Sequence, residues 1–149
     1  MKKALFPGSF NPFTRGHQSI VDRTVATIAD TVIIAIGVNY NKKYAESVDT
    51  RVEKLRKLYA DNPHVEVISY EGLTTDCALK VGADFIVRGI RCVKDFEYER
   101  DIAEVNRRLT GIETVFLFTE PELAHISSTI ARELQSYGKD ITDYLPAEH

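Results

Sequence analysis

The strongest constraint on the fold of this chain is an alternation between short apolar runs and longer segments of helical periodicity. The runs are rich in β-branched residues and lie at residues 4–6, 31–36, 65–68, 85–87 and 114–118. Each run is short and nearly all apolar, as is typical of parallel strands that are covered on both faces. We therefore expect five buried strands.

Four of the remaining segments carry apolar residues at helical spacing, namely residues 16–29, 52–58, 94–109 and 128–136. Alternating strands and helices indicate βαβ units, and right-handed crossovers favour an open parallel sheet with helices on both faces. In such a sheet, ligands bind beyond the carboxyl ends of the strands. The pattern thus predicts an α/β doubly wound fold, and the length of 149 residues predicts one domain over residues 1–149.

The net charge, the cysteines and the lengths of the apolar runs exclude several classes of partner and site. The net charge of -3 gives no general attraction to nucleic acid, which binds clustered Lys and Arg. Cys77 and Cys92 lack metal-ligand spacing, so we expect reduced thiols. No apolar run approaches the ~20 residues of a membrane span, and the first residues lack a signal-peptide core. We expect a cytoplasmic protein without nucleic-acid or membrane partners.

The loop after the first apolar run, residues 7–17, has features of a phosphate site. It matches neither a Walker A loop nor the GxGxxG fingerprint of nicotinamide-binding domains. Gly8 permits close approach of a ligand, and Thr14 is a suitable N-cap that leaves His17 in the first helical turn. That turn offers amides and a positive dipole end to a phosphate, and His17 adds a directed donor. The alternative is a simple Thr14 cap beside a solvated His17.

Further candidate phosphate ligands follow the fourth and fifth runs. Arg88 and Arg91 bracket a glycine just beyond the fourth run, where both guanidiniums could fork onto phosphate oxygens. The alternative is that one of them pairs with Glu97 or Glu99 on the next helix. Residues 127–129 open the last helix and offer hydroxyls and amides to an anion, or serve only as its cap.

Lys42 and Lys43 follow the second run, where a lysine can act as a mobile point charge for phosphate. Position alone leaves both as candidates, and we expect one of the two to be simply solvated. The sequence has no His/Cys cluster with metal-ligand spacing and no legible nucleophile–base pair. We therefore expect neither a metal held by the protein nor a covalent intermediate.

Three of these motifs together resemble one family. Thr14-x-Gly16-His17 resembles the TxGH form of the HxGH motif of the nucleotidyltransferase superfamily, and Ile126-Ser127-Ser128-Thr129 resembles its ISSS/T element. With Arg88-Gly89-Ile90-Arg91 in register between them, the closest resemblance is to the bacterial pantetheine-phosphate adenylyltransferases, and it covers essentially the whole chain. The resemblance implies a Rossmann-like five-stranded sheet of strand order 3-2-1-4-5.

The resemblance also implies an activity. Members of this family transfer the adenylyl group of ATP to 4′-phosphopantetheine, which gives dephospho-CoA and pyrophosphate during coenzyme A biosynthesis. It further implies Mg²⁺ carried with ATP, a homohexamer, and coenzyme A as a feedback ligand. Because the attacking phosphate oxygen is already ionised, such a reaction needs cations and dipoles rather than a general base.

Carried over position by position, the resemblance implies the role of each site residue. The catalytic residues would be His17, Lys42 and Arg91. Phosphopantetheine would meet Ser9, Lys42, Thr74 and Arg88. ATP would meet Ser9, Phe10, His17, Gly89, Ile90, Arg91, Glu99, Leu123, Ala124, His125, Ile126, Ser127, Ser128 and Thr129.

Departures from the family pattern leave alternatives open. Ser9 and Asn11 stand where members often carry Thr and Asp. Thr14 favours the pantetheine branch, since the nicotinamide-mononucleotide and cytidylyl relatives usually keep His there. One alternative is such a related adenylyl- or cytidylyltransferase. A second is a non-catalytic nucleotide sensor on the same fold, although a sensor needs no charge placed for a transition state.

Overall fold

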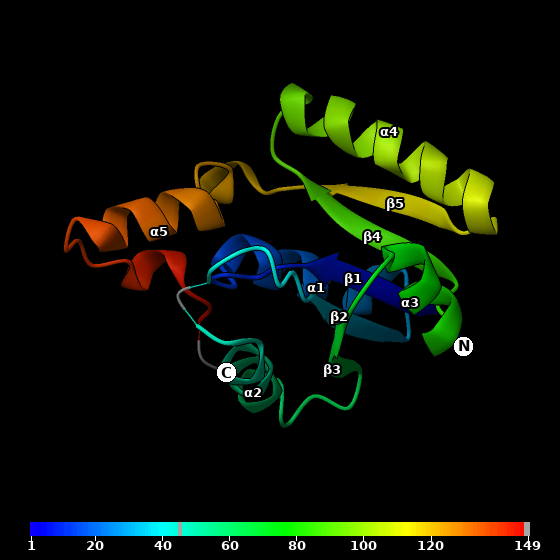
Figure 1. Cartoon of the computed structure of the whole chain (residues 1–149), viewed down its shortest axis with the longest axis horizontal. Coiled ribbons are helices and arrows are strands. Elements are labelled where there is room, and N and C mark those ends of the chain that lie inside the picture. The colour runs from blue at the N-terminus through cyan, green and yellow to red at the C-terminus, as the bar shows by residue number, and fades with distance from the viewer. Residues whose placement is uncertain (45, 148–149) are drawn as a thin grey trace.

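The computed structural model describes residues 1–44 and 46–147, in which five strands alternate with five α-helices (Figure 1). The strands are β1 (Lys3–Gly8), β2 (Thr31–Gly37), β3 (Val65–Tyr70), β4 (Phe85–Ile90) and β5 (Glu113–Phe118). The α-helices are α1 (Arg15–Thr27), α2 (Val48–Leu58), α3 (Thr74–Val81), α4 (Val93–Thr110) and α5 (Ser128–Ser136). Two short 3-10 helices, η1 (Pro121–Leu123) and η2 (Thr142–Tyr144), flank α5.

All five strands are parallel and lie in the order β3-β2-β1-β4-β5, which confirms the predicted doubly wound α/β fold. One helix is missing from the sequence prediction. Helix α3 spans eight residues, too few for a clear helical period, and its N-cap Leu73 makes no side-chain capping bond. Its end is marked instead by Gly82, whose φ of 72° suits a left-handed C-cap.

A second correction concerns Arg88, Gly89 and Ile90, which the sequence analysis places just beyond the fourth strand. These residues continue β4 and pair in register with Phe116, Leu117 and Phe118 of β5. The backbone bonds of a parallel ladder therefore prolong the strand past its apolar run. Only Arg91, of the four motif residues, lies beyond the strand end.

The inner strands β1 and β2 are buried on both faces, which explains why their buried stretches are apolar throughout, whereas the edge strand β3 alternates and leaves Glu66 exposed between Val65 and Val67. On one face, Phe6 and Ile34 pack with Ile20 of α1 and Leu55 of α2. On the other face, the neighbouring residues Leu5 and Ile33 pack with Cys77 and Ala78 of α3. Successive side chains of each inner strand thus enter two separate cores.

Helix α4 covers the sheet less completely than its apolar pattern predicts. It lies along β5 (Figure 1), but Phe96 and Ile102 are about two-fifths exposed and Val105 is 55% exposed. Its buried residue is Glu99. Across the described part of the chain, no helix combines the length and apolar character that a bilayer crossing requires.

The carboxyl ends of β1 and β4 mark the place where the chain reverses its direction across the sheet. Strand β1 leads to β2 on one side, whereas β4 lies on the other. β1 pairs with β2 from Lys3 to Gly8, but its pairing with β4 covers Ala4 and Leu5 alone among the described residues. The two central strands therefore separate toward their carboxyl ends. Such a switch point is where doubly wound sheets bind their ligands.

Candidate active site

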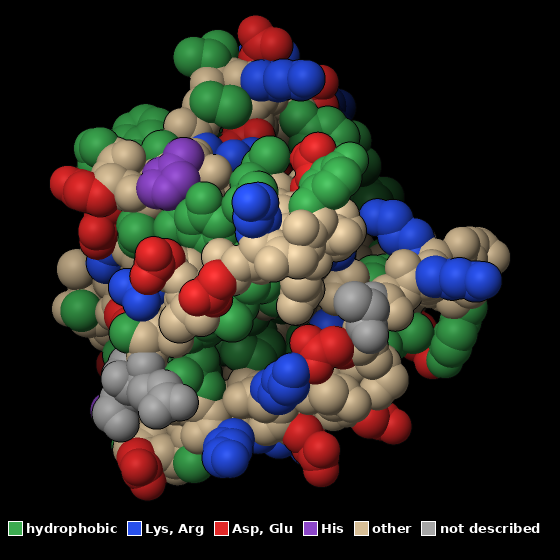
Figure 2. All heavy atoms as spheres, turned by 90° about the vertical axis from the view of Figure 1, so that its left-hand side faces the viewer, with side chains coloured by type: hydrophobic (Ala, Val, Ile, Leu, Met, Phe, Trp, Pro, Cys, Tyr) green, Lys and Arg blue, Asp and Glu red, His purple; other side chains and the backbone are tan. Residues whose placement is uncertain are grey.

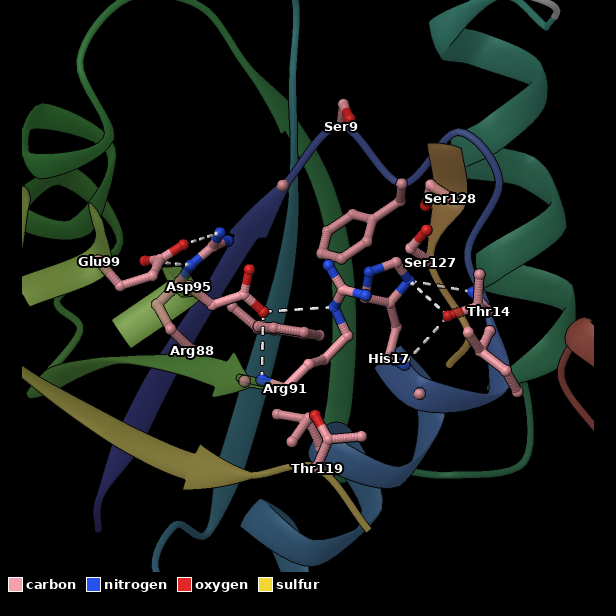
Figure 3. A pocket seen from close by; sticks show the side chains of 17 residues that line it. Ser9, Thr14, His17, Arg88, Arg91, Asp95, Glu99, Thr119, Ser127 and Ser128 are labelled. Carbon is pink, nitrogen blue, oxygen red and sulfur yellow. Dashed lines mark hydrogen bonds and ion pairs between the residues drawn. The ribbon is translucent and has the colours of Figure 1, made fainter. Parts of the chain in front are cut away.

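A cavity of about 280 Å³ opens between the separated ends of β1 and β4. We call it the His17 cavity. The loops after β1, β4 and β5 and the first turns of α1 and α5 build its walls (Figure 3). Its lining consists of Phe6, Gly8, Ser9, Phe10, Thr14, Gly16, His17, Ile20, Arg88, Gly89, Arg91, Asp95, Glu99, Thr119, Ile126, Ser127 and Ser128. His17 and Arg91 thus face the same space although they are far apart in sequence.

The orientation of His17 is determined by a reciprocal cap at the start of α1. The Thr14 side chain accepts a bond from the His17 backbone N–H, and the Thr14 N–H donates to His17 Nδ1 at 3.0 Å. Because Nδ1 accepts this bond, the neutral ring carries its proton on Nε2. The Nε2–H is therefore the donor that His17 can offer to a ligand. Thr14 is both a cap and a constraint on the imidazole.

Three aromatic rings surround the His17 imidazole. The ring of Phe10 lies edge-on at 5.0 Å between centroids, that of Phe13 lies at 5.4 Å and that of Phe6 at 6.2 Å. Burial among these rings, followed by the positive charges of Arg88 and Arg91, lowers the pKa of His17 to about 3. The imidazole is consequently a neutral hydrogen-bond donor at physiological pH.

Gly8 is required by the way Phe10 packs. A Cβ atom at Gly8 would lie 2.9 Å from the tip of the Phe10 ring. Phe10 itself has a φ of 47°, in the left-handed region that few residues other than glycine adopt. The turn after β1 thus folds Phe10 back over Gly8 and against His17, which packs the imidazole firmly.

Arg88 and Arg91 differ in how firmly their side chains are held. Arg88 forms a two-pronged pair with Glu99, in which Nε lies 3.0 Å from Oε2 and Nη2 lies 2.7 Å from Oε1. Its Nη1 also donates to the Pro7 carbonyl, in the gap between β1 and β4. Arg91 makes a looser contact of 3.3 Å with Asp95, one helical turn later (Figure 3). Arg88 is fixed in place, whereas Arg91 can turn toward a ligand at small cost.

These pairs balance the charge of the cavity. Two guanidiniums and two carboxylates line it, and His17 is neutral. Figure 2 faces the carboxyl ends of the strands and shows basic and acidic side chains interspersed there, without one large basic patch. Attraction of an anion to this cavity must therefore come largely from helix N-termini and from rearrangement of Arg91.

The start of α5 shows the capping role that the sequence analysis gave as the alternative for the serine motif. Ser127 caps the helix by accepting from the Ile130 N–H at 3.1 Å, and the Ser128 hydroxyl donates to the Pro12 carbonyl at 2.7 Å. The Ser127 hydroxyl is thus engaged in capping α5 itself, and the Ser128 hydroxyl holds α5 against the loop after β1. The backbone amides of the first turn of α5 remain as donors toward the cavity.

A second cavity, of about 320 Å³, adjoins the first. We call it the Tyr70 cavity. It shares Gly8, Ser9, Arg88 and Glu99 with the His17 cavity and extends from there toward α3 and α4. Its other lining residues are Pro7, Gly37, Val38, Asn39, Tyr70, Gly72, Thr74, Ile86, Tyr98, Ile102, Ala103, Asn106 and Thr114. The Tyr70 and Thr74 hydroxyls bond each other at 2.8 Å.

The structure brings together most of the residues singled out from sequence. Nine of the ATP candidates line the His17 cavity: Ser9, Phe10, His17, Gly89, Arg91, Glu99, Ile126, Ser127 and Ser128. Ser9, Thr74 and Arg88 line the Tyr70 cavity. Ile90, Leu123, Ala124, His125 and Thr129 lie in neither lining, and His125 packs against the ring of Tyr144 at 5.8 Å.

Lys42 also lies outside both linings. It is exposed in the turn that follows β2, where its backbone N–H donates to the Asn39 carbonyl. Because Asn39 lines the Tyr70 cavity, Lys42 lies close in sequence to that cavity's wall. A long, exposed lysine side chain can sample many rotamers, as expected of a mobile charge.

Sequence reasoning missed several lining residues. Tyr70 ends the third strand at the same edge as Arg88, so the carboxyl-end argument could have found it. Asp95 lies one helical turn after Arg91, a spacing typical of ion pairs. Tyr98 and Asn106 carry no such signal, because only packing of α4 beside β4 brings them to the site.

Comparisons with known proteins agree with this geometry. The family model described as cytidylyltransferase-like matches residues 5–134. The phosphopantetheine adenylyltransferase of Bacteroides thetaiotaomicron is 57% identical over 146 residues, which cover 98% of this chain and 96% of the relative. The chain belongs to the phosphopantetheine adenylyltransferase family. The predicted family is therefore confirmed.

Another phosphopantetheine adenylyltransferase, from Porphyromonas gingivalis, is 52% identical over 148 residues, covering 98% of this chain and 96% of the relative. Among solved structures, a Vibrio parahaemolyticus protein provisionally described as a nicotinate-nucleotide adenylyltransferase superposes with a TM-score of 0.67. At 21% identity over 99% of this chain and 88% of that one, this likeness concerns the fold. Within residues 1–44 and 46–147, no cluster of His, Cys, Asp and Glu is suited to hold a metal ion.

Proposed function

We propose that this protein transfers the adenylyl group of ATP to 4′-phosphopantetheine, forming dephospho-CoA and pyrophosphate. The observation that carries the proposal is the shared wall of the two cavities, formed by Gly8, Ser9, Arg88 and Glu99. A two-substrate transfer requires two sites that meet where the reacting atoms meet. The phosphopantetheine adenylyltransferase names of the relatives support the same substrates.

ATP would occupy the His17 cavity with its α-phosphate near the shared wall. Phosphopantetheine would lie in the Tyr70 cavity with its phosphate at the same wall. An oxygen of the acceptor phosphate attacks the α-phosphorus, and the bond from that phosphorus to the bridging oxygen of the β-phosphate breaks. Pyrophosphate leaves with the electron pair, so no proton transfer and no covalent enzyme intermediate are needed.

His17 would stabilise charge on the α-phosphate oxygens through its Nε2–H, with the first turn of α1 acting beside it. Arg91 and the α5 amides would hold the departing β- and γ-phosphates. Lys42 would swing from its exposed turn onto the acceptor phosphate. Ser9, Thr74 and Arg88 are assigned to phosphopantetheine. The ATP contacts are assigned to Ser9, Phe10, His17, Gly89, Ile90, Arg91, Glu99, Leu123, Ala124, His125, Ile126, Ser127, Ser128 and Thr129.

Mg²⁺ would arrive as part of the Mg·ATP substrate, since it commonly keeps waters and uses substrate phosphates as ligands. A homohexamer is part of the proposal. Exposed apolar side chains of α4, such as Val93, Val105 and Leu109, support an assembly that buries them. A cytoplasmic location and feedback by coenzyme A are also proposed. Sedimentation velocity tests the assembly, and inhibition by added coenzyme A tests the feedback.

A substrate panel tests the reaction itself. Pyrophosphate release from Mg·ATP is measured with 4′-phosphopantetheine, nicotinamide mononucleotide and pantoate as acceptors. We expect turnover with 4′-phosphopantetheine alone. Turnover with nicotinamide mononucleotide instead would reassign the substrate within the superfamily. Tight ATP binding without turnover of any acceptor would indicate a nucleotide sensor.

A further inference from the structure

Arg51 of α2 is a buried cation outside both cavity linings. It is 3% exposed, and its guanidinium lies 4.2 Å over the ring of Tyr44. Its Nη1 donates to the Ser9 carbonyl, and its Nε donates to the Glu46 carbonyl at 3.3 Å. Within the described residues its Nη2 is buried without a hydrogen-bond partner.

The partners of Arg51 belong to two different loops of the site. Ser9 lies in the turn after β1 and lines both cavities. Tyr44 and Glu46 belong to the segment between β2 and α2, which also carries Lys42. One side chain therefore connects the loop that bears the shared wall to the loop that bears the proposed phosphate lysine.

Stability alone gives a poor account of this arrangement. Burying a guanidinium costs solvation energy, and a buried N–H without a partner adds to that cost. An apolar side chain of similar volume would often hold α2 against the sheet at least as well. Burial also lowers the pKa of Arg51, although an arginine remains charged at neutral pH. A buried cation with directed donors is better suited to positioning than to packing.

A second arginine on the same helix provides the contrast. Arg56 donates to the Val67 carbonyl through Nε at 3.2 Å and Nη2 at 3.0 Å. Like Arg51, it binds backbone oxygen, but its partner lies on the edge strand β3. Arg56 thus resembles Arg51 in binding backbone oxygen, but it is exposed and reaches no residue of either cavity lining.

We propose that Arg51 is a positioning residue that sets the Lys42 loop relative to Ser9, so that both groups reach the acceptor phosphate together. The inference rests on the proposed function, because it assumes that a phosphate is bound at Ser9. It assigns Arg51 no contact with substrate. Because Lys42 is assigned to the acceptor alone, whereas Ser9 borders both cavities, the effect should fall mainly on the acceptor and on turnover, and the affinity for ATP should change far less.

The test compares Arg51→Met with Arg56→Met in the full chain. For Arg51→Met we expect KM for 4′-phosphopantetheine to rise about tenfold and kcat to fall about tenfold, with Kd for ATP within about twofold of the parent. Arg56→Met should alter the melting temperature and leave these kinetic constants within about twofold. Equal kinetic behaviour of the two variants would overturn the proposal.

A double-mutant cycle with Lys42→Met distinguishes positioning from a general loosening. If Arg51 acts through the Lys42 loop, adding Arg51→Met to Lys42→Met should lower kcat/KM by no more than about twofold further. Effects that multiply would contradict the proposal. If circular dichroism shows that Arg51→Met does not fold, Arg51→Lys takes its place, because lysine keeps the positive charge but lacks the planar guanidinium that donates to two carbonyls at once. An unchanged acceptor KM in folded Arg51→Lys would also contradict it.

These outcomes are separable from failure of the proposed function. If the unmodified protein releases no pyrophosphate with 4′-phosphopantetheine, the proposed function fails and this inference fails with it. If the unmodified protein turns over and the Arg51 variants match the Arg56 variant, only the role of Arg51 is lost.

Discussion

The His17 cavity and the Tyr70 cavity lie side by side at one edge of the sheet, yet different kinds of residue line them. The first is enclosed by two helix N-termini, by ion pairs and by a cluster of aromatic rings around the imidazole. The second runs along α4, where Ile102, Ala103 and Tyr98 supply apolar surface and Asn106 supplies an amide. One suits a polyanion held by directed donors, and the other suits a longer, mostly uncharged arm.

This contrast indicates that the precisely oriented donors of the site are concentrated in the His17 cavity. The His17 donor is fixed by capping bonds and ring packing before any ligand binds, as electrostatic stabilisation of a transition state requires, whereas Arg91 remains able to turn. The Tyr70 cavity needs to bind and align its occupant but not to stabilise new charge. The shared wall should then be the place where one substitution affects both substrates. The following predictions test this division.

The largest effect should come from His17→Ala. Loss of the Nε2–H donor should lower kcat by about 10² to 10³-fold, with Kd for ATP within about threefold, because the donor acts mainly on charge that develops in the transition state. Pyrophosphate release and calorimetric ATP binding measure the two quantities. His64→Ala, on an exposed loop before β3, is the matched control and should retain full turnover. Equal losses of kcat and ATP affinity would argue against this role.

Substitution of the shared wall should impair both cavities. Arg88→Gln leaves the carboxylate of Glu99 without its two-pronged partner. We expect KM to rise for both substrates and kcat/KM to fall by about 10²-fold. The free energy of unfolding should fall by about 1–2 kcal/mol, less than for a fully buried pair because the Arg88 side chain is 32% exposed. An effect confined to one substrate would show that the wall is not shared in function.

Arg91→Gln should affect the His17 cavity alone. Its partner Asp95 is held loosely at 3.3 Å and both side chains are partly exposed, so the free energy of unfolding should change by about 0.5 kcal/mol or less. Loss of a guanidinium from the leaving pyrophosphate should lower kcat/KM for ATP by about tenfold. KM for 4′-phosphopantetheine, measured at saturating ATP, serves as the internal control and should not move.

Thr74→Val should affect the Tyr70 cavity alone and more weakly. The substitution removes the hydroxyl that bonds Tyr70 at 2.8 Å and that could bond the acceptor. Loss of one neutral hydrogen bond should raise KM for 4′-phosphopantetheine about fivefold. Tyr70→Phe removes the other member of the same bond and is the companion variant. A rise in KM for ATP in either variant would contradict the separation of the cavities.

The smallest expected effect concerns the protonation of His17, whose imidazole should remain neutral over the pH range in which histidines ordinarily titrate. Its folded pKa of about 3 lies below the ordinary value of 6.5, so the unfolded chain binds the proton more readily. The resulting stability is present above pH 6.5 and is lost as the pH falls toward 3. Nitrogen-15 NMR of the ligand-free protein should show a neutral ring with its proton on Nε2 from pH 8 to pH 5. Protonation near pH 6.5 would disprove the burial argument.

Sequence patterns identified the five strands because each carries a short run rich in β-branched or other apolar residues, which is apolar throughout where both faces are buried, as in β1 and β2. They failed at α3, whose eight residues leave little period to detect, and at Arg88, whose charge concealed its place in a strand. For the site, Thr14 and His17 could be placed together because a capping pattern is local. Asn106 could not be placed, because its presence in the same cavity lining as Thr74 depends on how α3 and α4 pack beside one another.

The alternation of elements, the order in which the candidate phosphate-binding motifs follow the strands and the family of the chain can all be read from the residues in linear order. The unequal pairing of the two arginines, the desolvation of His17 by three aromatic rings and the link that Arg51 makes between two loops emerge only in the folded chain. These two groups of features differ in the range of the interactions that produce them. Periodicity and capping depend on neighbours in the chain, whereas burial, charge balance and a pKa depend on groups that only folding brings together.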